Sequence, residues 1–137
     1  MNLAELVNIA RQAQTQAYAP YSGFRVGAAL LGRDGTVFTG VNVENASYGL
    51  TICAERNAVF KAVTAGERDF VALAITSSGS GYVYPCGACL QVLAEFSPHI
   101  QVIVTDESDN NIVYDLGELL PQVFACSGKR NSPGEGL

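Results

Sequence analysis

Three of the four cysteines have the spacing of a metal site. Cys86 and Cys89 are separated by two residues and preceded by Pro85, while Cys53 lies further upstream. Because Cys89 enters a predicted helix, the two sulfur atoms of this pair can face a common point, and Cys53 opens another predicted helix. Thiolate-rich tetrahedral sites favour zinc, and three protein ligands leave a fourth position for water. The spacing therefore predicts one catalytic zinc ion per chain.

Glu55 stands two positions after Cys53, at the start of the same predicted helix. From there its carboxylate can reach a water on the metal, and general acid-base catalysis requires such proximity. The structural alternative is a glutamate that only interacts with the positive end of the helix dipole. The position beside the predicted metal favours the proton-transfer role.

Arg56 follows directly and is the predicted partner of the thiolates. Three thiolates around Zn²⁺ leave a net charge of minus one. A guanidinium can offset this charge because it stays cationic and donates hydrogen bonds to sulfur. The alternative is an exposed helix arginine, which the residues alone leave open.

The fourth cysteine and the single histidine are not expected to bind the metal. Cys126 could close the site as a fourth thiolate, which would make the protein a structural zinc module instead of an enzyme. Its place at the start of the C-terminal tail favours a bystander. His99 follows Pro98 just ahead of a predicted strand, where an exposed turn residue is expected.

The elements that would position these residues alternate between helices and strands. Apolar residues at three- and four-residue intervals predict an opening helix, and turn residues between two apolar segments predict a hairpin. The order strand, helix, strand, helix, strand that follows implies right-handed crossovers and an α/β fold with a partly parallel sheet and helices on both faces. Helices are predicted over residues 3–17, 53–65, 86–96 and 116–120, and strands over residues 25–31, 36–43, 70–76, 100–105 and 112–114.

The composition suits one domain of this kind. A chain of 137 residues with 48% hydrophobic residues predicts a single domain over residues 1–126, followed by a flexible Gly- and Ser-rich tail over residues 127–137. The formal charge of -5 argues against nucleic acid as a partner. No apolar stretch approaches the roughly 20 residues of a membrane-spanning helix. The N-terminus also lacks a signal-peptide pattern, so a soluble cytoplasmic protein is expected.

Four segments, together with the cysteine pattern, resemble the small homotetrameric cytidine deaminases. They are residues 18–24 (YAPYSGF), 26–31 (VGAALL), 42–48 (NVENASY) and 53–56 (CAER). The resemblance implies a three-layer α/β/α sandwich with a mixed central sheet of about five strands. It also implies zinc-dependent hydrolysis of cytidine or 2'-deoxycytidine to the uridine analogue and ammonia, as in pyrimidine salvage. Water activated by zinc would attack C4 of the ring, while Glu55 protonates N3 and later the departing amino group.

The resemblance also implies substrate contacts. Asn42 and Glu44 lie two apart in an extended segment, share one face, and would hold the ribose hydroxyls. Phe24 would pack on the pyrimidine, although a core aromatic is an equal alternative on the residues alone. The backbone N–H of Ala54 would meet the base. Two further aromatic residues would reach across an interface in a homotetramer with shared active sites: Tyr48 and Phe124.

Two departures from the family pattern widen the expected substrate range. Leu90 stands where the family usually has arginine, and Phe124 is followed by Ala125 and Cys126 in place of Gly-Pro. Either change could reshape a pocket wall, so the alternative substrates are cytidines with a larger N4 substituent. A single-stranded nucleic acid substrate would need a basic channel, and the acidic balance favours a free nucleoside.

Overall fold

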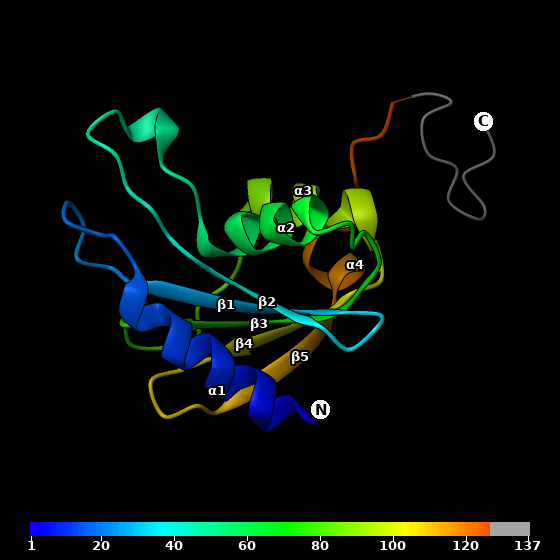
Figure 1. Ribbon diagram of the computed structural model, residues 1–137, viewed down its shortest axis with the longest axis horizontal. Helices are drawn as coiled ribbons and strands as arrows, with labels where there is room; N and C mark the ends of the chain where they lie inside the picture. Colours follow the sequence, from blue (N-terminus) through cyan, green and yellow to red (C-terminus); the bar gives the residue numbers. More distant parts are fainter. Residues whose placement is uncertain (127–137) are drawn as a thin grey trace.

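A five-stranded mixed sheet forms the middle layer of the molecule (Figure 1). The computed structural model describes residues 1–126. The strand order is β2-β1-β3-β4-β5, in which β3 and β4 are parallel and the other neighbours antiparallel. The strands are β1 (Val26–Gly32), β2 (Val37–Val41), β3 (Phe70–Ser77), β4 (Gln101–Thr105) and β5 (Asn111–Asp115).

Helices cover both faces of the sheet, as predicted. Helix α1 (Leu3–Ala13) lies on one face (Figure 1). On the other face lie α2 (Ala54–Thr64), α3 (Gly87–Phe96) and the short α4 (Leu116–Leu119). The three-layer α/β/α sandwich with five strands is therefore confirmed.

The side chains of the strands divide between two cores. Ala28 and Leu30 of β1 belong to the core under α2 and α3, whereas Ala29 between them packs with α1. This alternation follows from the two-residue period of a strand, and it explains why the central strands are apolar throughout. All three residues are fully buried.

Two predicted elements end two or more residues earlier in the structure, whereas the other predicted bounds differ by one residue at most. The opening helix ends at Ala13 and continues only as a 3-10 turn, Gln14–Gln16, although apolar spacing extends to Ala17. Strand β2 ends at Val41, although the N–H of Asn42 still donates to the carbonyl oxygen of Val26 on β1 at 3.4 Å. Val43 instead forms isolated bridges with Tyr18 and Ile52. A local apolar pattern cannot reveal such a change of partner.

Gly40 brings helix α2 directly onto the sheet. A Cβ atom at Gly40 would overlap the carbonyl oxygen of Ala54 and lie 2.5 Å from the backbone nitrogen of Ala58. Only glycine permits this approach of helix to strand. The close packing fixes the N-terminal end of α2, where Cys53 is the N-cap residue.

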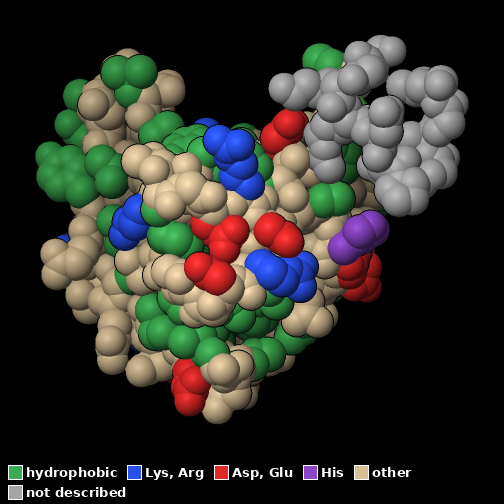
Figure 2. All heavy atoms as spheres, turned by 45° about the vertical axis from the view of Figure 1, so that its right-hand side comes forward, with side chains coloured by type: hydrophobic (Ala, Val, Ile, Leu, Met, Phe, Trp, Pro, Cys, Tyr) green, Lys and Arg blue, Asp and Glu red, His purple; other side chains and the backbone are tan. Residues whose placement is uncertain are grey.

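The surface mixes charges. On the face shown in Figure 2, acidic and basic side chains lie next to one another. Within residues 1–126, no helix is both long enough and apolar enough to cross a membrane. The predicted tail, residues 127–137, lies outside the described residues.

Candidate active site

Two helix N-termini bring the three predicted cysteines together. Cys53 is the N-cap of α2, Cys86 is the N-cap of α3, and Cys89 lies in the first turn of α3. The Sγ atoms of Cys53 and Cys86 are 3.9 Å apart, and those of Cys86 and Cys89 are 3.5 Å apart. All three sulfur atoms lie within 4.8 Å of one another.

This cluster fits one zinc ion per chain. Zinc–sulfur bonds of about 2.3 Å in a tetrahedron imply sulfur–sulfur distances of about 3.8 Å, close to the two distances above. The positive ends of two helix dipoles stabilise thiolates at this point. Cys89 is buried while Cys86 is exposed, so the cluster is accessible to solvent from the side of Cys86.

The thiols are strongly coupled. A hydrogen bond from Cys89, with a smaller contribution from Arg56, lowers the pKa of Cys53 to about 5. The same bond, together with burial, raises the pKa of Cys89. Zinc binds cysteines as thiolates, so zinc binding would release the protons that these thiols carry.

Arg56 lies beside the cluster. Its Nη2 donates to Cys53 Sγ at 3.4 Å, and this hydrogen bond is the largest cause that raises the pKa of the guanidinium. The side chain is half-buried. The structure therefore brings a permanent positive charge to the thiolates.

Glu55 lies in the first turn of α2 and is only 4% exposed. Burial is the main reason why the pKa of its carboxyl group is raised to about 7. A carboxyl group with such a pKa can both accept and release a proton near neutral pH. Glu55 has the burial and the position that a proton carrier needs.

A pocket of about 190 Å³ opens at the thiolate end of the sheet. Its walls bring together six of the residues that the sequence analysis singled out and four that it did not. The lining residues are Phe24, Val26, Asn42, Thr51, Cys53, Ala54, Glu55, Val83, Tyr84 and Cys86. The predicted residues Phe24, Asn42 and Ala54 therefore share one pocket with Glu55 and two of the cysteines.

Asn42 is built into the wall of this pocket. Its Oδ1 accepts a hydrogen bond from the backbone N–H of Val26 at 2.9 Å, and its Nδ2 donates to the carbonyl oxygen of Phe24 at 2.8 Å. The residue is 8% exposed. Asn42 thus fixes the backbone on both sides of Arg25 and holds Phe24 at the pocket.

Glu44 faces a neighbouring hollow instead. Its carboxylate accepts hydrogen bonds from the backbone N–H groups of Tyr21 and Ser22 and from the Ser22 hydroxyl. The bond from the Ser22 hydroxyl is the largest of the contributions that lower the Glu44 pKa. This hollow of about 300 Å³ is lined by Tyr21, Ser22, Glu44, Tyr48 and Thr51. Thr51 lines both spaces and so connects them.

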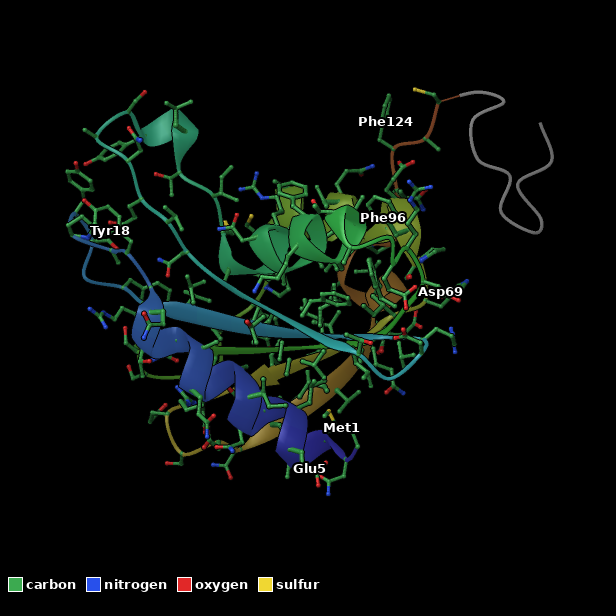
Figure 3. The ribbon with its side chains drawn as sticks, in the orientation of Figure 1. Met1, Glu5, Tyr18, Asp69, Phe96 and Phe124 are labelled. Carbon is green, nitrogen blue, oxygen red and sulfur yellow. The ribbon has the colours of Figure 1, made fainter. Side chains whose placement is uncertain are left out.

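Tyr48 and Phe124 stand away from the pocket of their own chain. Tyr48, in the 3-10 turn Tyr48–Leu50, is 78% exposed, and Phe124 is 74% exposed. Figure 3 shows Phe124 on the terminal segment, pointing away from the sheet. The backbone of Phe124 is held by Gln91, whose side-chain amide donates to its carbonyl oxygen at 2.8 Å and accepts from its N–H at 3.2 Å.

Four lining residues were missed by sequence reasoning: Val26, Thr51, Val83 and Tyr84. The only signal for Tyr84 and Thr51 is their place two residues before a zinc-binding cysteine. The Tyr84 hydroxyl lies 3.0 Å from that of Tyr114 on β5. Such pairing depends on the fold and cannot be predicted from local sequence.

Leu90, Cys126 and His99 lie outside the pocket lining. Leu90 is 6% exposed and packs in the core under α2 and α3, so its side chain does not line the pocket of about 190 Å³ in this chain. Cys126 is exposed and is not one of the three clustered cysteines. His99 is exposed, with its Nδ1 3.9 Å from Asp115.

Known proteins share both the sequence and the fold. The family model for the cytidine and deoxycytidylate deaminase zinc-binding region matches residues 1–105. A cytidine deaminase from Halalkalibacterium halodurans is 49% identical over 127 residues, which cover 92% of this chain and 96% of that protein. One from Sporosarcina psychrophila is 46% identical over 126 residues, covering 91% and 93%. The crystal structure of cytidine deaminase from Burkholderia pseudomallei matches with a TM-score of 0.87 and 48% identity, over 90% of this chain and 100% of that one. The chain belongs to the zinc-binding cytidine and deoxycytidylate deaminase family.

Proposed function

We propose that this protein hydrolyses cytidine and 2'-deoxycytidine to the corresponding uridines and ammonia, within pyrimidine salvage. The observation that carries the proposal is the buried Glu55 at one end of a pocket, beside three cysteines that fit a zinc ion. The relatives named cytidine deaminase support the choice of substrate. The net negative charge of the chain also favours a free nucleoside over a nucleic acid strand, because the phosphate backbone of a strand requires positive charge.

Glu55 is the proposed proton carrier. The chemistry that zinc supplies when bound is the activation of water. Glu55 would take a proton from the attacking water and give it to N3 as the water oxygen bonds to C4. It would then carry the proton of the new C4 hydroxyl to the amino group, so that the C4–N bond breaks and ammonia leaves. Its burial and its pKa of about 7 suit transfers in both directions.

Arg56 is proposed to balance the charge of the metal site. With zinc bound, three thiolates leave a net charge of minus one. The hydrogen bond from Arg56 to Cys53 brings a cation to this charge. The guanidinium would thereby withdraw electron density from the ligand sulfur atoms.

Base and ribose are proposed to be held by separate walls. Phe24 packs on the pyrimidine, and the backbone N–H of Ala54 donates to the base. Asn42 can still offer its second amide N–H, because only one donates to a group within residues 1–126. Glu44 also keeps acceptor capacity beyond its three bonds. These two residues are the proposed ribose ligands.

A homotetramer with shared active sites is part of the proposal. The pocket of about 190 Å³ in one chain is smaller than the roughly 300–1,000 Å³ of typical ligand sites. The exposed rings of Tyr48 and Phe124 are suited to complete the walls of a neighbour's pocket. A cytoplasmic location also belongs to the proposal, because thiol ligands require a reducing compartment.

The test compares purified protein of known zinc content with Glu55→Gln, following the absorbance loss as cytidine becomes uridine. The variant should retain zinc and lose activity by about 10²–10⁴-fold, the usual contribution of general acid-base catalysis. Glu95→Gln, an exposed position on α3, is the matched control and should behave as wild type. Zinc-loaded wild type that leaves both nucleosides intact would refute the substrate, and protein without zinc would refute the whole proposal.

A further inference from the structure

The Phe24 ring rests against the loop that follows β3. A Cβ atom built at Gly79 would lie 2.7 Å from Cε1 of Phe24, 3.5 Å from Cδ1 and 3.7 Å from Cζ. Phe24 lines the pocket, whereas Gly79 does not. The ring therefore lies beside the loop and also lines the pocket.

This loop is anchored along its length. The carbonyl oxygen of Ser77 accepts from Arg11 Nη1 at 2.7 Å, and the N–H of Gly81 donates to Glu107 at 2.7 Å. Between them, Ser78 exchanges two hydrogen bonds with the backbone of Arg25, one through its own N–H at 2.8 Å and one through its hydroxyl at 2.9 Å. The loop cannot retreat from the ring without breaking these bonds.

The backbone of Phe24 is held as well. Its N–H donates to the Ser22 hydroxyl at 2.9 Å, and its carbonyl oxygen accepts from Asn42 at 2.8 Å. With loop and backbone both fixed, any atom added at Gly79 must be accommodated by rotation of the ring. The ring is 42% exposed and lines the pocket, so a rotation away from Gly79 changes the wall that the ring forms there.

We infer that Gly79 is a positioning residue that sets where the Phe24 ring stands, and thereby how well the pyrimidine fits. The inference rests on the proposed contact between Phe24 and the base. It does not require Gly79 to touch the substrate. Its missing side chain leaves the space that the ring occupies beside the loop.

Gly79→Ala tests this directly, because Gly79 does not have a left-handed φ and its backbone accepts alanine. We expect the KM for cytidine to rise by about 3- to 10-fold, as a forced off-rotamer ring implies, with kcat within about twofold of wild type. The dissociation constant of uridine should rise in parallel, which gives a measurement independent of turnover. Ser80→Ala, an exposed neighbour in the same loop, should change none of these values.

A double-mutant cycle with Phe24→Leu decides the cause. Leucine lacks Cε1 and Cζ, the atoms nearest and third nearest to the added Cβ, so Gly79→Ala should raise KM less than about twofold in that background. An equal rise in both backgrounds, or no rise in wild type, would overturn the inference. If Phe24→Leu alone leaves KM unchanged, the proposed contact of Phe24 with the base fails too. Zinc content and the unfolding temperature should match wild type throughout.

Discussion

Arg56 is held at the active site in spite of a cost in hydrogen bonding. Its Nη2 donates to Cys53, while its buried Nε has no hydrogen-bond partner among residues 1–126. An unsatisfied buried donor destabilises a protein by about 1–3 kcal/mol. The negative charge of the thiolates provides the compensating attraction, so the arginine and the metal site depend on each other.

Replacing this arginine should therefore impair catalysis more than folding. In Arg56→Gln a donor remains but the positive charge is lost, and we expect kcat to fall by about 10- to 100-fold, the usual effect of altering a ligand's hydrogen-bond partner. Steady-state kinetics and zinc content measured on the same samples check this. Arg68→Gln, an exposed arginine elsewhere, is the control. Wild-type kcat in zinc-loaded Arg56→Gln would contradict the proposed charge balance.

Local spacing was sufficient to find the metal cluster but not the contacts of Glu44. The three cysteines stand at helix starts, and helix starts leave a periodic pattern in the sequence. The hydrogen bonds from Tyr21 and Ser22 to Glu44 join segments that only the fold brings together. A motif can thus identify a functional residue without revealing the hydrogen bonds that its side chain already makes.

At the scale of elements, the site depends on how closely α2 lies against the sheet. Gly40 of β2 contacts the backbone of α2 at Ala54 and Ala58 without any intervening side chain. The first turn of this helix carries Glu55 and Arg56 and follows Cys53. Any displacement of α2 from β2 would move all three together.

Gly40→Ala should therefore reduce both stability and zinc affinity. The added methyl overlaps fixed backbone atoms, and overpacking of this kind costs about 1–3 kcal/mol. Urea unfolding measures the stability, and competition with a chelator measures the affinity. Gly49→Ala, where the new Cβ would meet nothing within 4 Å, is the matched control. A Gly40→Ala protein as stable as this control would show that α2 can shift without cost.

The layers of the fold were predictable because each element is long and periodic. The pairing of the strands was less predictable than the layers. Strand β2 was predicted to continue to Val43, but the backbone of Val43 pairs with Tyr18 and Ile52. The contact of Gly79 with Phe24 was equally hidden, since it joins two loops that are distant in sequence. Pairing across long separations is a property of the whole sheet, and a local pattern does not contain it.

At the scale of the whole molecule, a single chain leaves four aromatic side chains largely exposed. Tyr18, Tyr21, Tyr48 and Phe124 are each more than half exposed. Aromatic residues that are exposed in a single chain are often buried at the centre of an interface in the assembled protein. In the proposed tetramer, Gln91 would serve the neighbouring site, because it holds the backbone of Phe124 by two hydrogen bonds.

Co-expression of two impaired variants tests the shared site. Glu55→Gln lacks the proton carrier but supplies an intact Phe124, whereas Phe124→Ala retains Glu55 and should bind cytidine weakly. If each pocket combines Glu55 of one chain with Phe124 of a neighbour, random assembly in equal amounts makes about a quarter of the sites complete. At cytidine concentrations well below the KM of Phe124→Ala, the mixture should then exceed the sum of the two variants assayed separately. Light scattering on the same sample should give about four times the 14.5 kDa of one chain. Activity that equals the sum of the separate variants in a mixed tetramer would mean that each chain uses only its own residues.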